Sequence, residues 1–336
     1  MKSKIAFIDH HYHTKTKSGD FLRELLLLNF KIDNYWINSN LKFDDKIFAY
    51  EKLFFFQILP SFNDLKKLKN KNIIWAPMYD SPHYPYGYSW ILWKIVEYFD
   101  IKVISFSKKI TDQIKNKNIN YISLKFHKKN RYAKINNKIN IFFWNRGDIK
   151  IADWIETVDL KMINKIYYLN LDKIQPEKID SSIKEKFFII KKKFLDQKSF
   201  FKLLMKCEIF VSPRKKEGIG MAQVEALSLG KYLLAFKEST MDDYILNKKI
   251  GIFFSKNNYD PLDMKNVINF KKYRLHFNKK NYLKYESDKK LIINSFKKNT
   301  PFKFNIFFEL LVFFFYFYKV LIRKFITIPF SNKFNN

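Results

Sequence analysis

The sequence predicts an α/β protein of two domains, each built on a parallel β-sheet. Short apolar runs alternate with helical stretches along most of the 336 residues, a pattern typical of βαβ units. A polar stretch without periodicity divides this alternation, and a new apolar strand follows it. Between residues 209 and 230, a strand, a glycine-containing loop and the start of a helix follow one another. The length is sufficient for two domains of ordinary size.

The first domain is expected at residues 1–126. Ile5–Ile8 is a continuous apolar run, which is typical of a central parallel strand, and a loop at residues 9–19 leads to a helix at Phe21–Leu28. Further strands are predicted at residues 34–37, 53–58, 72–76, 102–106 and 120–124, and helices at 63–68, 89–99 and 107–114. Ligands of such sheets bind outside the carboxyl ends of the strands.

The second domain is expected at residues 139–285, after a polar linker at 127–138. Its strands are predicted at residues 139–144, 165–169, 186–191, 208–211, 231–236 and 250–254, and its helices at 196–205, from about 221, and at 241–246. A closing helix is expected within residues 286–303, and an apolar and basic tail at 304–336.

The stretch at residues 211–230 reads V-S-P-R-K-K-E-G-I-G-M-A-Q-V-E-A-L-S-L-G. The free N–H groups and the dipole of a helix start favour a diphosphate, and two glycines allow the backbone to approach it. Seven residues separate Glu217 from Glu225. One carboxylate can therefore face a sugar beyond the phosphates, and the other can reach the hydroxyls of a nucleoside ribose.

This stretch resembles the E-x7-E signature of retaining glycosyltransferases of the GT-B fold, in particular glycosyltransferase family 4 (glycosyl transferases group 1). The strand ends in Ser-Pro, E-G-x-G precedes the helix, and E-A-L-x-L-G continues it. The resemblance implies two Rossmann-like domains with parallel sheets that face one another across a cleft. The alternative is an ordinary βα turn with a solvated Glu217 and a surface Glu225.

The resemblance also implies roles for individual residues. Glu217 is expected to bind the donor sugar and Glu225 the ribose, while Arg146 and Lys150 stabilise the leaving diphosphate. The donor loop comprises Gly218, Ile219, Gly220 and Met221, and the nucleobase is expected near residues 194–196. The gap from Arg146 to Lys150 is shorter than the family's usual spacing, and a solvated βα loop is the alternative for both. No metal and no cofactor is expected, because side-chain cations and the helix dipole offset the charge.

Two loops of the first domain are candidates for the acceptor side. The loop at residues 9–19 contains His11, His13 and Gly19. A metal site is an alternative for the histidines, but no third and fourth ligands follow them. The loop at residues 76–83 contains Asp80 and His83, and its alternative is a proline-rich turn.

The composition is strongly basic, with 63 Lys and Arg against 32 Asp and Glu and a formal net charge of +31. Such a charge is typical of proteins that bind nucleic acid or an anionic membrane, or it reflects a composition biased towards Lys, Asn, Ile, Phe and Tyr. The basic residues are dispersed, so no nucleic acid is expected. A single cysteine, Cys207, excludes an internal disulfide. No signal peptide opens the sequence, so a cytoplasmic protein is expected.

The tail is apolar and aromatic at residues 306–322, where Glu309 and Lys319 are the only charges, and Arg323 and Lys324 follow. This run is shorter than a membrane span, so the tail is predicted to lie in the interface at the inner face of the membrane. Packing on the protein's own surface is the alternative.

Together these features predict an enzyme that moves a sugar from a nucleoside-diphosphate-sugar to an acceptor hydroxyl with retention. The expected acceptor is a saccharide or is lipid-linked, in the synthesis of cell-surface polysaccharide, lipopolysaccharide or glycolipid. Two alternatives stay open: a basic nucleic-acid-binding protein, and a GT-B protein that binds a nucleotide-sugar without turnover.

Overall fold

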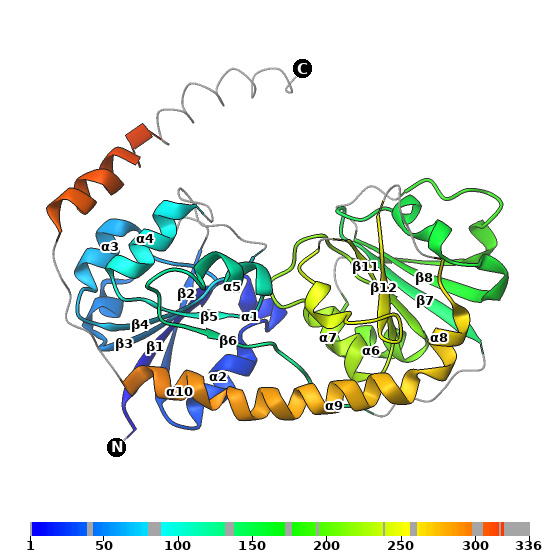
Figure 1. Ribbon diagram of the computed structural model, residues 1–336, viewed down its shortest axis with the longest axis horizontal. Helices are drawn as coiled ribbons and strands as arrows, with labels where there is room; N and C mark the ends of the chain where they lie inside the picture. The colour runs from blue at the N-terminus through cyan, green and yellow to red at the C-terminus, as the bar shows by residue number, and fades with distance from the viewer. Residues whose placement is uncertain are drawn as a thin grey trace. The chain divides into compact units, whose positions relative to one another are not determined.

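The computed structural model describes residues 2–38, 43–79, 89–131, 138–171, 177–192, 195–237, 239–255, 261–297, 305–315 and 317–318. The chain forms two compact units (Figure 1). Unit 1 comprises Met1–Ser105, Ile110–Ser123 and Lys289–Asn336, and unit 2 comprises Phe106–Lys109 and Leu124–Asp288. Residues after 288 therefore belong to the same unit as the N-terminus.

The sheet of unit 1 has six strands in the order β2-β1-β3-β4-β5-β6, and all their pairings are parallel. The strands are β1 (Lys4–His10), β2 (Lys31–Ile37), β3 (Lys52–Phe56), β4 (Asn72–Ala76), β5 (Lys102–Ser105) and β6 (Tyr121–Ser123). The helices are α1 (His13–Thr16), α2 (Asp20–Leu27), α3 (Phe62–Lys67), α4 (Trp90–Tyr98), α5 (Lys108–Ile114) and α10 (Lys290–Asn294), with short 3-10 helices η1 (Asp45–Ala49) and η7 (Ser295–Lys297). The expected strands of the first domain are confirmed, whereas α1 falls in a stretch expected to be loop.

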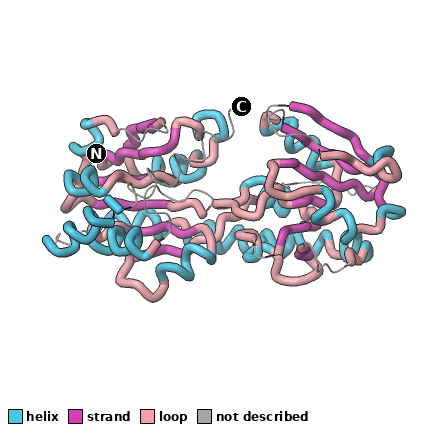
Figure 2. Tube along the Cα trace, turned by 90° about the horizontal axis from the view of Figure 1, so that it is seen from above, coloured by secondary structure: helices cyan, strands magenta, loops and turns pink. Residues whose placement is uncertain are grey.

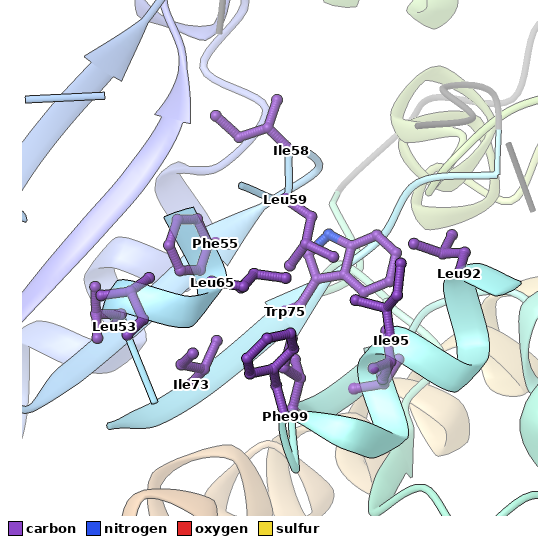
Figure 3. Packing of buried hydrophobic residues seen from close by; sticks show 14 of the residues in the cluster. Leu53, Phe55, Ile58, Leu59, Leu65, Ile73, Trp75, Leu92, Ile95 and Phe99 are labelled. Atoms are coloured by element: carbon purple, nitrogen blue, oxygen red, sulfur yellow. The ribbon is translucent and has the colours of Figure 1, made fainter. Parts of the chain in front are cut away.

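The core of unit 1 is centred on Trp75 of β4, which is fully buried (Figure 3). Residues of β3, α3 and α4 surround it, including Phe55, Leu65 and Ile95. Trp75 Nε1 donates a hydrogen bond to the Gln57 carbonyl at 3.3 Å. The indole therefore contributes a large apolar area without leaving a buried donor unsatisfied.

The sheet of unit 2 also has six strands, in the order β12-β11-β10-β7-β8-β9, and all their pairings are parallel. Figure 2 shows the strands of the chain in magenta and its helices in cyan. The strands are β7 (Ile139–Asn145), β8 (Ile163–Leu171), β9 (Phe187–Lys192), β10 (Ile209–Val211), β11 (Tyr232–Phe236) and β12 (Gly251–Phe254). The α-helices are α6 (Gln197–Met205), α7 (Met221–Ser228), α8 (Met264–Asn269) and α9 (Lys271–Asp288). The 3-10 helices are η2 (Ile151–Asp153), η3 (Ile155–Thr157), η4 (Leu160–Met162), η5 (Lys184–Lys186) and η6 (Asp242–Tyr244).

One expectation for unit 2 is wrong, and one long helix was missed. The helix predicted at residues 241–246 is a short 3-10 helix, η6, at Asp242–Tyr244. The long helix α9 was not predicted, because its sequence is polar and lacks an apolar stripe. Its buried positions are Arg274, Asn278 and Tyr285, and two of these make polar contacts rather than apolar ones.

Candidate functional site

The order of strands in unit 2 marks one position at the carboxyl edge of the sheet. The chain runs outward from β7 through β8 to β9 and then returns to place β10 on the other side of β7. Val211 pairs with Phe143, so the loops that follow β7 and β10 leave the sheet next to each other. Ligands of parallel α/β sheets bind at this kind of switch point.

The loop after β10 ends in a sharp turn at Gly220. Its backbone is left-handed, with φ of +67°, and an added Cβ would lie 2.8 Å from Met241 Cε. Gly220 O accepts hydrogen bonds from the N–H groups of Gln223 and Val224 at 2.9 and 3.0 Å. The Ser212 hydroxyl donates to Gln223 Oε1 and connects the end of β10 to α7. A residue other than glycine would therefore disturb the start of α7.

Glu217 lies on this loop and is partly buried. Its N–H group donates to Thr240 Oγ1 at 2.8 Å, which ties the loop to the segment after β11. Gly218 and Ile219 are buried, and Met221, the first residue of α7, is partly exposed. The structure thus places Gly218, Ile219 and Gly220 in one turn and Met221 at the start of the helix that follows it, where the first N–H groups have no partner within the helix.

Glu225 is buried in α7, with 6% of its surface exposed. Its Oε1 accepts a hydrogen bond from Lys128 Nζ, and its Oε2 lies 3.9 Å from Arg131 Nη1. The Arg131 guanidinium in turn lies over the ring of Phe201 in α6, 4.9 Å from its centroid. The alternative of a surface Glu225 is wrong, because the carboxylate is buried beside two cationic side chains.

Lys128 and Arg131 were not predicted as site residues, because they lie in the segment expected to be a linker. Residues 127–131 of this segment are described, and they pack on unit 2. The N–H of Arg131 donates to Ser228 O at 3.1 Å, and Asn278 Nδ2 donates to Lys128 O at 2.8 Å. No local signal in the sequence indicates these contacts, since the partners are about 100 to 150 residues away.

The loop after β7 contains Arg146 and Lys150. Asn145 is buried and organises the loop, because its Nδ2 donates to Tyr168 OH and its Oδ1 accepts from Gly147 N, both at 2.9 Å. The Arg146 guanidinium lies over the Trp144 ring, 4.7 Å from its centroid, and Lys150 is exposed.

A direct ion pair connects this loop to the donor loop. Arg214 Nε, three residues after β10, lies 3.2 Å from Asp148 Oδ2. The predicted diphosphate cation Arg146 and the predicted sugar ligand Glu217 therefore stand on two loops that contact one another.

The predicted acceptor loop of unit 1 contains a buried ionic cluster around Asp9. Asp9 Oδ1 lies 2.5 Å from His13 Nδ1, and Asp9 Oδ2 accepts from Arg23 Nη2. A Cβ added to Gly19 would lie 2.8 Å from Asp9 Oδ2, so Gly19 makes room for this cluster. His11 is exposed, whereas His13 is buried. Arg23 and Gly19 are buried as well.

Some predicted residues cannot be placed. Asp80 and His83 lie outside the described residues, and of the predicted nucleobase loop only residues 195–196 are described. Asp196 begins α6, and its Oδ1 accepts from Ser199 N at 2.8 Å. Within the described part of the chain, no group of three or more His, Cys, Asp or Glu side chains could hold a metal ion.

Residues 175–283 match the family model described as glycosyl transferases group 1. A glycosyltransferase from Rickettsia africae is 12% identical, with 88% of this chain and 98% of that chain covered and a TM-score of 0.56. HepE from Anabaena, solved with UDP and glucose, is 8% identical, with 88% and 100% covered and a TM-score of 0.54. The fold is GT-B.

Further comparisons define the extent of this GT-B likeness. TarM from S. aureus, solved with UDP, is 15% identical over 74% of this chain, with a TM-score of 0.51. This chain covers 56% of the TarM chain, that is, little more than half of its length. No curated protein matches the sequence. The family match lies within unit 2, confirms the resemblance predicted from the donor loop, and supports a glycosyltransferase.

Proposed function

We propose that this GT-B protein transfers a sugar from a nucleoside-diphosphate-sugar to an acceptor hydroxyl. The observation that carries the proposal is the pair of loops at the switch point of unit 2. One loop holds Glu217 and the glycine turn, the other holds Arg146, and the Arg214–Asp148 ion pair joins them. This position and these groups match the needs of an anionic donor.

The chemistry requires stabilisation of the departing diphosphate. The first N–H groups of α7, which begins at Met221, point towards the residues that precede the helix, and the helix dipole adds positive potential there. Arg146 supplies a fixed cation on the neighbouring loop, and Lys150 supplies a second, exposed one. Charge that develops on the leaving group is therefore met by donors that are in place beforehand.

Glu217 is proposed to bind hydroxyls of the donor sugar, and Glu225 the ribose. Retention at the anomeric carbon is proposed from the resemblance to family 4. Because HepE was solved with UDP and glucose, and TarM with UDP, uridine diphosphate sugars are the first donors to test. The acceptor is proposed to be a saccharide or a lipid-linked saccharide.

The test compares the wild type with Glu217→Gln and Arg146→Met for release of UDP from a panel of UDP-sugars, with and without saccharide acceptors. Each substitution is expected to lower the rate by about 100-fold or more. Glu156→Gln, an exposed acid of the same unit, is the control and is expected to match the wild type. If both site variants match the wild type as well, the assigned site is wrong.

Binding is measured in parallel to separate an enzyme from a non-catalytic binding protein. UDP or a UDP-sugar that binds the folded protein raises the melting temperature by mass action. A rise in melting temperature without product from any acceptor would favour the binding protein. Product formed by the wild type, and reduced in Glu217→Gln, would establish the transferase.

A further inference from the structure

The helix at residues 306–315 packs on unit 1 through one face (Figure 1, red-orange). Val312 is 1% exposed, and Phe308 and Phe315 pack against the same core cluster. The Phe308 ring lies 4.6 Å from the ring of Tyr98 in α4, measured between centroids. These three residues recur at spacings of four and three, so they form one stripe of the helix.

Polar contacts fix the orientation of the helix. Glu309 Oε2 lies 2.9 Å from Lys66 Nζ, and Glu309 Oε1 accepts from Tyr98 OH at 3.3 Å. At the start of the helix, Asn305 N donates to Tyr98 OH and Asn305 Oδ1 accepts from Phe308 N, both at 3.1 Å. Apolar and polar contacts therefore both hold the helix on unit 1, and together they fix which of its faces points away from unit 1.

That opposite face is apolar and exposed, and we call it the aromatic face. Phe307 is 81% exposed and Phe314 is 64% exposed. The face also contains the exposed side chains of Leu310, Phe313, Phe317 and Tyr318. From residue 306 to residue 318, Glu309 is the only charged residue, and it faces unit 1. A continuous exposed patch of this kind marks an interaction surface.

We propose that the aromatic face docks on an anionic lipid membrane and lies in its interface. Aromatic side chains favour the boundary between headgroups and acyl chains, and an interfacial helix need not span the bilayer. Among the described residues, no helix is both long and apolar enough to cross a membrane. The proposed mode of contact is docking of one helix face.

The charge of the chain favours an anionic membrane, rather than a second copy of the chain, as the partner of the aromatic face. After Glu309 the sequence contains four basic residues, Lys319, Arg323, Lys324 and Lys333, and no acidic residue. Basic residues near an anionic membrane strengthen its attraction for the chain. Two copies of a chain with a net charge of +31 repel one another, whereas the same charge attracts anionic lipid.

The experiment measures flotation of the full chain with lipid vesicles. The wild type is expected to bind vesicles of phosphatidylcholine mixed with phosphatidylglycerol, and to bind phosphatidylcholine vesicles much more weakly. Phe307→Ser/Phe314→Ser is expected to lower binding by about tenfold or more, because binding scales with buried apolar area. Leu246→Ser/Leu283→Ser, at exposed apolar positions outside the tail helix, is the matched control and is expected to bind as the wild type does.

A second variant, Phe313→Ser/Phe317→Ser, repeats the test at other positions of the same face, and the melting temperature of each variant verifies its folding. Both variants should lose binding while they melt as the wild type does. The proposal would be overturned if both variants bound vesicles as strongly as the wild type does. It would also be overturned if the wild type bound neither kind of vesicle. A dimer in light scattering that dissociates in Phe307→Ser/Phe314→Ser would overturn it too, since the face would then join two copies. Neither result would affect the proposed sugar transfer, which is measured with soluble acceptors.

Discussion

Lys128 Nζ donates a hydrogen bond to Glu225 Oε1 across 97 positions of sequence. Arg131 Nη1 lies 3.9 Å from the other carboxylate oxygen. A buried carboxylate requires such partners, because removal from water disfavours its charged form. The acid proposed to bind the ribose is thus already oriented within unit 2, and the residues that orient it belong to the segment between the expected domains.

The buried Lys128–Glu225 pair predicts that removal of one charge destabilises the protein more than removal of both charges. Lys128→Met leaves a buried carboxylate with only the more distant Arg131, and it is expected to cost about 3 kcal/mol in the free energy of unfolding. Lys128→Met/Glu225→Leu removes both charges and is expected to recover most of that loss. Urea unfolding measures both. The control is Lys94→Met, which breaks a more exposed Lys94–Glu97 pair and is expected to cost less than about 1 kcal/mol. An equal loss in the free energy of unfolding for Lys128→Met and Lys94→Met would contradict the prediction.

Gly220→Ala should damage both folding and donor binding. An alanine at a φ of +67° costs about 1 kcal/mol or more, and its Cβ would also collide with Met241. We expect a lower melting temperature and a weaker rise of that temperature on addition of UDP. Gly147→Ala, at a φ of +86° on an exposed residue, is the comparison for stability, since it adds the conformational cost without the Met241 contact. A UDP response as large as that of the wild type would argue against the glycine turn as the diphosphate site.

His127 predicts a loss of stability in mild acid. Its ring is buried, and Nδ1 lies 3.1 Å from Asn278 Oδ1. Burial, which the Asn278 contact opposes and the charge of Lys125 reinforces, lowers the pKa of His127 to about 4. The unfolded chain takes up the proton near pH 6.5, but the folded protein does so only near pH 4. Stability is therefore lost as pH falls from about 6.5 towards 4.

Unfolding at pH 7 and pH 5 measures this component, which is expected to be about 2 kcal/mol. His127→Gln should show a smaller difference between the two pH values than the wild type. His276→Gln, at an exposed histidine of α9, is the control and should retain the wild-type difference. If His127→Gln shows the full difference, other groups cause the acid sensitivity.

Arg274 predicts that a polar position of α9 is essential for stability. The side chain is 1% exposed and donates to the carbonyl oxygens of Gly230, Asn266 and Val267 at 2.8, 3.0 and 2.6 Å. Arg274→Met removes these hydrogen bonds to buried carbonyl oxygens and is expected to cost about 3 kcal/mol or more. Arg274→Lys keeps the charge but not the planar fork, so it should also destabilise. Lys272→Met, at an exposed position, should leave the urea midpoint unchanged.

The agreement between sequence and structure is greatest for the strands. Runs such as Ile5–Ile8 and Ile141–Trp144 are apolar without interruption because both faces of a parallel sheet are covered, so a short window of sequence contains the whole signal. The glycine turn before α7 is equally local, since Gly220 and the start of the helix lie within a few residues. Helix α9 has no such local signal, because its buried residues are mostly polar and their partners lie elsewhere in the chain.

For the tail as well, the sequence predicts the composition and the structure shows which side chains are buried. Its apolar and aromatic character was evident from the sequence, but either packing on the protein or exposure to a membrane was consistent with it. The structure shows that Val312 packs on unit 1 while Phe307 is exposed, so the one helix has a face of each kind.

By itself, the sequence determined the parallel strands, the donor turn at Gly220 and the spacing of Glu217 and Glu225, because these depend on residues close together in the chain. The tertiary structure alone decided that Lys128 partners Glu225, that Asp148 joins the Arg146 loop to the donor loop, and that Arg274 binds backbone carbonyls. Each of these contacts joins residues from separate elements. Buried polar groups take whichever partner the packing of those elements brings within reach, and that packing is not encoded in any local pattern.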